Sequence, residues 1–226
     1  MGMTLDPKAF AGQGGGRSSG LPVVALLQVA VANAVATWWA VRSGWPPLML
    51  AIPFWVQSLV IGWFYRQRIL ALQHFNTAGF EMDGRPVPET AETRETTARF
   101  LAMHYGFFHA IYAVFLVAFG FAGTLGSTAG LDWADAGSVV GLGALFALTQ
   151  YGEHRRTVAS DRTLEPNIGA MMFLPYVRVI PMHLMILVGA ALGGGSAAVL
   201  VFGVLKAAAD ALMLVLEERL VAKSST

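Results

Sequence analysis

Residues 197–220, AAVLVFGVLKAAADALMLVLEERL, form an apolar run long enough to cross a bilayer as a helix. About 20 helical residues, each rising roughly 1.5 Å, span a hydrocarbon core of roughly 30 Å. Five further apolar runs precede this one, and the fourth of them is diluted by glycine. They cover about residues 21–41, 46–69, 100–121, 136–151 and 168–192. Because the runs are continuous rather than alternating, they predict six membrane-spanning helices and not a β-barrel.

The composition supports an all-α, polytopic membrane protein. Of the 226 residues, 55% are hydrophobic and 13% are charged, whereas a soluble domain carries about 25% charged residues. A net charge of +1 without a basic stripe argues against a nucleic-acid partner. The absence of cysteine excludes disulfides, thiolate catalysis, iron–sulfur clusters and Cys-rich zinc sites. No hydrolase nucleophile motif, phosphate loop or dinucleotide fingerprint is present, so the sequence assigns no enzyme class.

Basic residues gather on one side of the six predicted spans. The opposite side has Arg42 alone and a loop that contains Asp132 and Asp135. By the positive-inside rule, both termini and the two polar loops are cytoplasmic, in a bacterial inner (plasma) membrane. The basic residues on the cytoplasmic side are Lys8, Arg17, Arg66, Arg68, Arg85, Arg94, Arg155, Arg156, Arg162, Arg219 and Lys223.

Three segments are predicted along the chain: a flexible Gly/Ser-rich tail over residues 1–20, a membrane domain over 21–220, and a short tail over 221–226. The loop 74–97 leads into the third helix, since Pro88 followed by acidic residues is typical of a helix start. The first span could instead be a signal peptide cleaved after Ala34. Its apolar run continues to Val41, longer than a typical signal sequence, which favours a retained anchor.

Six ionisable residues lie within the predicted spans away from the charged residues at their cytoplasmic ends. Placing a charged side chain at the centre of a bilayer costs about 2.5–3.5 kcal/mol on insertion scales, so such residues usually face the bundle interior and have partners. We therefore expect them to form a polar intramembrane cluster and to mark the functional site. They are His104, His109, Arg178, His183, Lys206 and Asp210.

Lys206 and Asp210 are four residues apart and so share one face of the last helix. One interpretation is an intrahelical ion pair that lowers the cost of inserting both residues. Another is that Asp210 acts as a metal ligand, proton carrier or general base, with Lys206 tuning its charge. A retinal-binding lysine is disfavoured, because six spans are predicted rather than seven.

The fifth predicted span contains Pro175 and Pro181, which should kink it. Arg178 between them could extend to the cytoplasmic interface, or it could bind an anionic head group or substrate. On the third span, His104 and His109 point about 140° apart, so an undistorted helix cannot use both for one ion. Each histidine could simply bond a neighbouring helix.

A metal site is the most specific hypothesis for these residues. His109 and Asp210 fall at mid-membrane depth, as does His183, while His104 lies a turn nearer the cytoplasm. Two or three imidazoles with one carboxylate suit a divalent ion such as zinc, iron or copper. The expected ligands are His104, His109, His183 and Asp210.

Four stretches resemble a prokaryotic family of small polytopic membrane proteins that is classed as a domain of unknown function. They are FWVQSLVIG at 54–62, HYGFFHAIY at 104–112, LPYVR at 174–178 with His183, and KAAAD at 206–210. The likeness covers about residues 50–218, and members commonly have Glu where this chain has Gln57. The resemblance implies a helical inner-membrane protein with polar residues at the six positions above, and no established activity or ligand.

Three classes of function remain open from the sequence. The first is a metal- or proton-dependent intramembrane site built on His104, His109, His183 and Asp210. The second is a small transporter or channel whose pathway is lined by Arg178, Lys206 and Asp210. The third is a structural or accessory subunit that binds a membrane-protein partner or a second copy of itself.

Overall fold

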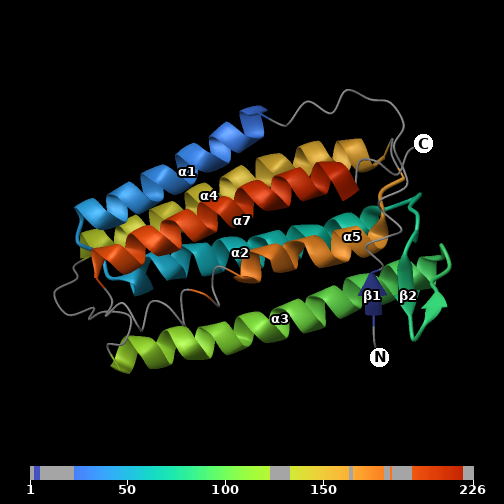
Figure 1. Cartoon of the computed structure of the whole chain (residues 1–226), viewed down its shortest axis with the longest axis horizontal. Helices are drawn as coiled ribbons and strands as arrows, with labels where there is room; N and C mark the ends of the chain where they lie inside the picture. Colours follow the sequence, from blue (N-terminus) through green and yellow to red (C-terminus); the bar gives the residue numbers. More distant parts are fainter. Residues whose placement is uncertain are drawn as a thin grey trace.

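The structure, a computed structural model, describes residues 3–5, 23–122, 133–162, 165–180, 184 and 195–220. Figure 1 shows a bundle of long helices lying side by side, with a small sheet at one end. The helices are α1 (Val23–Arg42), α2 (Pro47–Ala71), α3 (Ala91–Ala122), α4 (Trp133–Asp161), α5 (Ile168–Phe173), the 3₁₀ helix η2 (Leu174–Arg178) and α7 (Ser196–Leu220). The strands β1 (Met3–Leu5), β2 (Phe80–Met82) and β3 (Arg85–Pro86) form one antiparallel sheet in the order β1-β2-β3.

The helical fold class predicted from the sequence is confirmed. Among the described residues, four helices are long and apolar enough to cross a membrane: α1, α2, α3 and α7. Helix α4 has the length, but it is not among these four, because glycine and polar residues dilute its hydrophobicity. Of the predicted fifth span, 168–180 are described and helical, whereas 181–183 and 185–192 lie outside the described residues.

Helix α2 is the central element of the bundle. It packs against α3, α4, α5 and η2, whereas α1 packs mainly along α7. In its most apolar window 61% of the residues are buried, against 17% in α1 and 22% in α3. The outer helices therefore present apolar side chains outward, as expected where lipid replaces water around a protein.

Two contacts, one at each end of the bundle, show which helices begin at that end. The first turn of α4 meets the connection between α1 and α2, where Trp45 Nε1 donates to Asp135 Oδ1 at 2.8 Å. At the other end, the loop after α2 meets the start of α5, where Asn167 Nδ2 donates to Asn76 Oδ1 at 2.9 Å. Helix α4 thus begins at the end of the bundle where α1 finishes and α2 begins, and α5 begins at the end where α2 finishes.

The N-terminal segment differs in part from the predicted flexible tail. Met3–Leu5 pair with Phe80–Met82 in the small sheet, while residues 6–22 lie outside the described part of the chain. The sheet forms at the end of the bundle where α2 finishes and α3 begins (Figure 1). Helix α3 then starts at Ala91, just after Pro88, well before the apolar run at 100–121.

The packing of α1 on α7 yields a test. A Cβ atom at Gly203 of α7 would overlap Thr37 Oγ1 of α1 and lie 3.0 Å from Thr37 Cβ. We expect Gly203→Ala to lower the free energy of unfolding by about 1–3 kcal/mol through overpacking. The matched control is Gly141→Ala on α4, which meets open space and should be neutral or gain up to about 1 kcal/mol of helix propensity. Thermal unfolding in detergent measures both, and equal stability of the two variants would contradict the tight α1–α7 contact.

Candidate functional site: a charged group on an intramembrane pocket

Four polar residues from three elements meet in the interior of the bundle. Asp210 Oδ2 of α7 accepts hydrogen bonds from Lys206 Nζ and, at 3.0 Å, from Asn33 Nδ2 of α1. Arg178 Nε of η2 lies 3.3 Å from Asp210 Oδ1. All four side chains are buried, and Arg178 is only 4% exposed. We refer to Asn33, Arg178, Lys206 and Asp210 as the Asp210 group.

The Asp210 group has more positive than negative charge. Two formal cations, Arg178 and Lys206, face one carboxylate. The Lys206 ammonium also lies over the Phe54 ring, 4.8 Å from its centroid, in a cation–π contact. Arg178 Nε donates in addition to Met213 Sδ at 2.9 Å. The interior of the bundle therefore has a formal surplus of one positive charge at this point.

The backbone around Pro175 brings Arg178 to α7. Helix α5 begins at Asn167, whose side chain accepts from the Ala170 amide, and it ends after six residues. Pro175 cannot donate a helical hydrogen bond, and the chain continues from Leu174 as a 3₁₀ helix that ends at Arg178. The predicted kink is thus a change of helix type. Arg178 points inward, towards α7, and does not extend to the membrane interface as the alternative interpretation would require.

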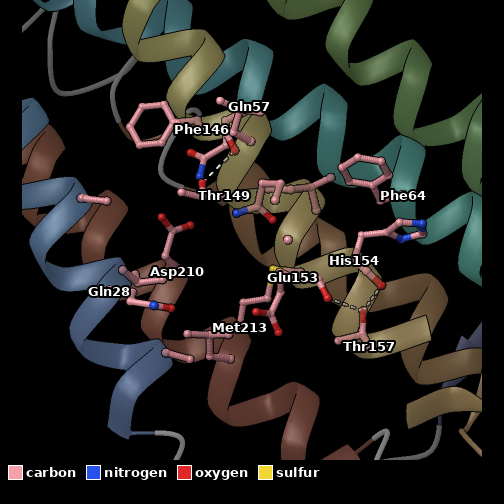
Figure 2. Close-up of a pocket in the computed structure, with 18 of the residues that line it drawn as sticks. Gln28, Gln57, Phe64, Phe146, Thr149, Glu153, His154, Thr157, Asp210 and Met213 are labelled. Atoms are coloured by element: carbon pink, nitrogen blue, oxygen red, sulfur yellow. Dashed lines mark hydrogen bonds between the residues drawn. The ribbon is translucent and has the colours of Figure 1, made fainter. Parts of the chain in front are cut away.

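A large pocket borders the Asp210 group. Its cavity volume is about 790 Å³ and its walls come from α1, α2, α4, η2 and α7, within the 300–1,000 Å³ typical of ligand sites. In Figure 2, Asp210 and Met213 of α7 lie on one side of it, and Glu153 and His154 of α4 lie on the other.

Six buried polar atoms of residues that line this pocket lack a hydrogen-bond partner among the described residues. Two of them belong to Tyr65 and His154, which lie near Arg68, and the other four belong to Gln57 and to members of the Asp210 group. One is a donor, Arg178 Nη1. Three are acceptors: Asn33 Oδ1, Gln57 Oε1 and Asp210 Oδ1. A buried polar group without a partner costs about 1–3 kcal/mol. A ligand that enters the cavity would therefore lie next to the residues that carry these atoms.

A second charged group lies along the same pocket, where α2, α4 and α7 end. Arg68 donates through Nε and Nη2 to both carboxylate oxygens of Asp161, at 2.8 and 3.1 Å, and through Nη1 to Glu217 Oε1 at 2.5 Å. Arg68, Asp161 and Glu217 form what we call the Arg68 group, which has one surplus negative charge. Burial, helped by the positive charge of Arg68, lowers the pKa of the nearby His154, so that neutral imidazole adds no charge here at pH 7.

His109 belongs to a separate network between α2 and α3. Its Nδ1 lies 2.9 Å from the Tyr105 carbonyl oxygen, which can only accept, so Nδ1 carries the hydrogen. In the neutral ring, Nε2 then accepts from the Ser58 hydroxyl at 2.9 Å, and the Ser58 oxygen in turn lies 2.6 Å from the Tyr105 hydroxyl. Both ring nitrogens are occupied, which leaves no lone pair for a metal.

His104 does not join the Asp210 group. His104 lies on the outer side of α3, where Nδ1 is 2.9 Å from the Tyr176 hydroxyl and the ring stacks on Phe100. His183 lies outside the described residues. The described part of the chain contains no group of three or more His, Cys, Asp or Glu side chains that could hold a metal ion. The hypothesis of a divalent metal on His104, His109, His183 and Asp210 thus gains no support.

Sequence reasoning missed two parts of this arrangement. Asn33, next to the Ala34 position of the alternative signal peptide, is not among the six predicted polar residues, although an amide inside an apolar run is itself a signal of burial. Arg68 was counted among the cytoplasmic basic residues, yet it is 4% exposed and ion-paired. Its partners, Asp161 and Glu217, come from helix ends far apart in sequence, so spacing alone could not have revealed the contact.

Comparison with known proteins identifies a family whose function is unknown. The profile described as "Family of unknown function (DUF6498)" matches residues 16–226, which confirms the resemblance to an uncharacterised family. No curated protein matches the chain. No solved structure matches it either.

The His109 network predicts a stability effect that is separate from the pocket. Ser58→Ala removes the hydroxyl that bonds His109 Nε2, and we expect a loss of about 1–3 kcal/mol in the free energy of unfolding. The control is Ser138→Ala, an exposed serine on α4 that bonds only the Ala134 carbonyl of its own helix; its change should stay within about 0.5 kcal/mol. Thermal unfolding in detergent distinguishes them. A Ser58→Ala protein as stable as Ser138→Ala would show that the network contributes nothing.

Proposed function

Because the chain belongs to this family of unknown function, we propose its role from the site itself: it is a six-span plasma-membrane protein that recognises an anionic group within the membrane. The observation that carries the proposal is Arg178. Its side chain is only 4% exposed and lines the pocket, and its Nη1 has no partner among the described residues. Arginine presents a planar fork of donors that suits carboxylate and phosphate oxygens.

The local charge supports an anion rather than a neutral ligand. An isolated charge in the bilayer centre is costly and needs a partner. Asp210 compensates one of the two cations beside it. An anionic ligand at Arg178 would compensate the other and would satisfy the free donor at the same time.

A carrier function is a second candidate, favoured by the extent of the pocket. The cavity is lined both by members of the Asp210 group and by Arg68 and Glu217. On α7, Asp210 and Glu217 are seven residues apart, which is about 10 Å along a helix. A ligand could therefore move between the middle and one end of the bundle without leaving the pocket.

Binding of anions by the purified chain in a neutral detergent tests the proposal. The probes are inorganic phosphate and dodecyl phosphate, measured by calorimetry and by the shift in melting temperature. We expect at least one of them to bind the wild type, and Arg178→Gln to weaken that binding at least about thirtyfold, as expected when a buried charged partner is removed. Arg178→Lys, which keeps the charge but loses the fork, should retain part of the affinity.

The matched control is Arg99→Gln on α3, where the arginine is exposed and does not line the pocket. Its affinity should equal that of the wild type. Binding of neither anion to the folded wild type, or equal affinities in Arg178→Gln and Arg99→Gln, would overturn the proposed anion site.

Membrane orientation can be tested directly because the chain has no native cysteine. A single cysteine is introduced by Ser43→Cys, between α1 and α2, or by Glu89→Cys, before α3; both positions are exposed. With both termini cytoplasmic, a membrane-impermeant maleimide added to intact cells should label the first and not the second. Labelling of Glu89→Cys but not Ser43→Cys would reverse the orientation, and equal labelling in intact and permeabilised cells would contradict the proposed six-span topology.

A further inference from the structure

We propose that the ligand of this pocket is an anionic phospholipid with hydroxyl groups on its head, which enters sideways from the cytoplasmic leaflet between α1 and α4. This inference rests on the proposed function and names its ligand. It follows from four properties of the pocket: where it opens, what lines its length, which atoms are free at its inner end, and how charge is distributed along it.

The pocket opens between two helices that do not pack closely on each other. Helix α1 packs along α7, and α4 packs along α2, so α1 and α4 form opposite walls. The pocket-lining residues of these walls include apolar side chains with large exposed fractions, such as Val31 at 60% and Leu148 at 68%. Exposed apolar side chains around an opening favour contact with acyl chains rather than with water.

Polar side chains line the pocket behind this apolar opening. On α4, Thr149, Glu153 and Thr157 all line the cavity and are spaced four residues apart, so they share one face of the helix. Figure 2 shows this row facing the cavity that Asp210 and Met213 border from α7. The row offers a head group polar contacts along the pocket while its chains remain in the bilayer.

The free atoms at the inner end match one kind of head group. Arg178 Nη1 is a donor and suits a phosphate oxygen, whereas Asn33 Oδ1 and Gln57 Oε1 are acceptors. The orientation of Asn33 is fixed, because its Nδ2 donates to both Val29 O and Asp210 Oδ2. The phosphate of a phosphodiester lipid can satisfy the arginine, and the acceptors require hydroxyl hydrogens from the same head. Phosphatidylglycerol has both groups.

The charge distribution favours the inner end for the phosphate. The Arg68 group has a surplus negative charge and lies where α2, α4 and α7 end. The Asp210 group has a surplus positive charge about 10 Å further in, by the rise of α7 between residues 217 and 210. A phosphate is thus repelled at the entrance end and attracted deeper in the pocket.

Photolabelling with lipids tests the inference on the full chain in phosphatidylcholine nanodiscs. The probes are phosphatidylglycerol and phosphatidylmethanol, each with a diazirine in one acyl chain; the second has the same phosphate but no hydroxyls. We expect phosphatidylglycerol to label peptides of α1 and α4 at least about tenfold more than phosphatidylmethanol does, and Arg178→Gln to abolish the difference. Gln57→Leu, which removes one acceptor, should reduce the preference severalfold.

Matched tryptophan variants test the place of entry. Val31→Trp narrows the opening between α1 and α4, whereas Val114→Trp changes an equally exposed valine of α3 that does not line the pocket. Labelling by phosphatidylglycerol should fall severalfold in the first and stay unchanged in the second. Both variants present an apolar ring to lipid, so a folding defect should affect them alike, and their melting temperatures check this.

The outcomes separate this inference from the proposed function. Equal labelling by the two lipids, or equal labelling of α3 and of the α1–α4 walls, overturns the lipid inference. If inorganic phosphate or dodecyl phosphate still binds in an Arg178-dependent way, the anion site stands and its ligand is another anion. If Arg178→Gln changes neither lipid labelling nor anion binding, both proposals fail.

Discussion

The carboxylate of Asp210 joins three elements in the interior of this bundle. It binds Lys206 on its own helix, Asn33 on α1 and the guanidinium of Arg178 on η2. Three elements distant in sequence therefore converge on two oxygen atoms. Removing one member of a buried ion pair typically costs about 3–5 kcal/mol, since the other charge is left uncompensated. One carboxylate compensates only one of the two cations beside it, so stability alone does not explain the second cation. An anionic ligand in the adjacent pocket would compensate it.

Sequence alone predicted the elements well and the site in part. Apolar length predicts a helix because lipid forces the backbone to satisfy its own hydrogen bonds, and α1, α2, α3 and α7 follow from it. The cost of an intramembrane charge likewise predicted that Lys206 and Asp210 would find partners. The depth of a residue along a membrane-spanning helix does not, however, predict the direction in which its side chain points around the helix axis. His109 bonds Ser58 rather than a member of the Asp210 group, and Asn33 was not expected at the site.

The two charged groups on the pocket differ in how fully the nitrogens of their arginine are paired. All three arms of the Arg68 guanidinium meet carboxylate oxygens, as expected for a structural tie between helix ends. Arg178 uses Nε for Met213 and approaches Asp210, yet its Nη1 has no partner among the described residues. Arg68 thus has partners on all three guanidinium nitrogens where helices are joined, whereas Arg178 keeps one nitrogen without a partner among the described residues. That contrast distinguishes a binding arginine from a structural one within a single chain.

The irregular backbone at Leu174–Arg178 fits the same interpretation. Hydrocarbon does not tolerate a helix whose hydrogen bonds are broken unless protein or a polar cavity surrounds the break. Pro175 interrupts the α-helical pattern, and the resulting 3₁₀ turn is covered by α2 and α7 while its last residue borders the pocket. A regular helix would have rotated residue 178 to a different direction, because 3₁₀ and α-helices differ in residues per turn. The proline is therefore part of what aims Arg178 at Asp210, and the free guanidinium nitrogen is a consequence of backbone geometry as much as of residue type.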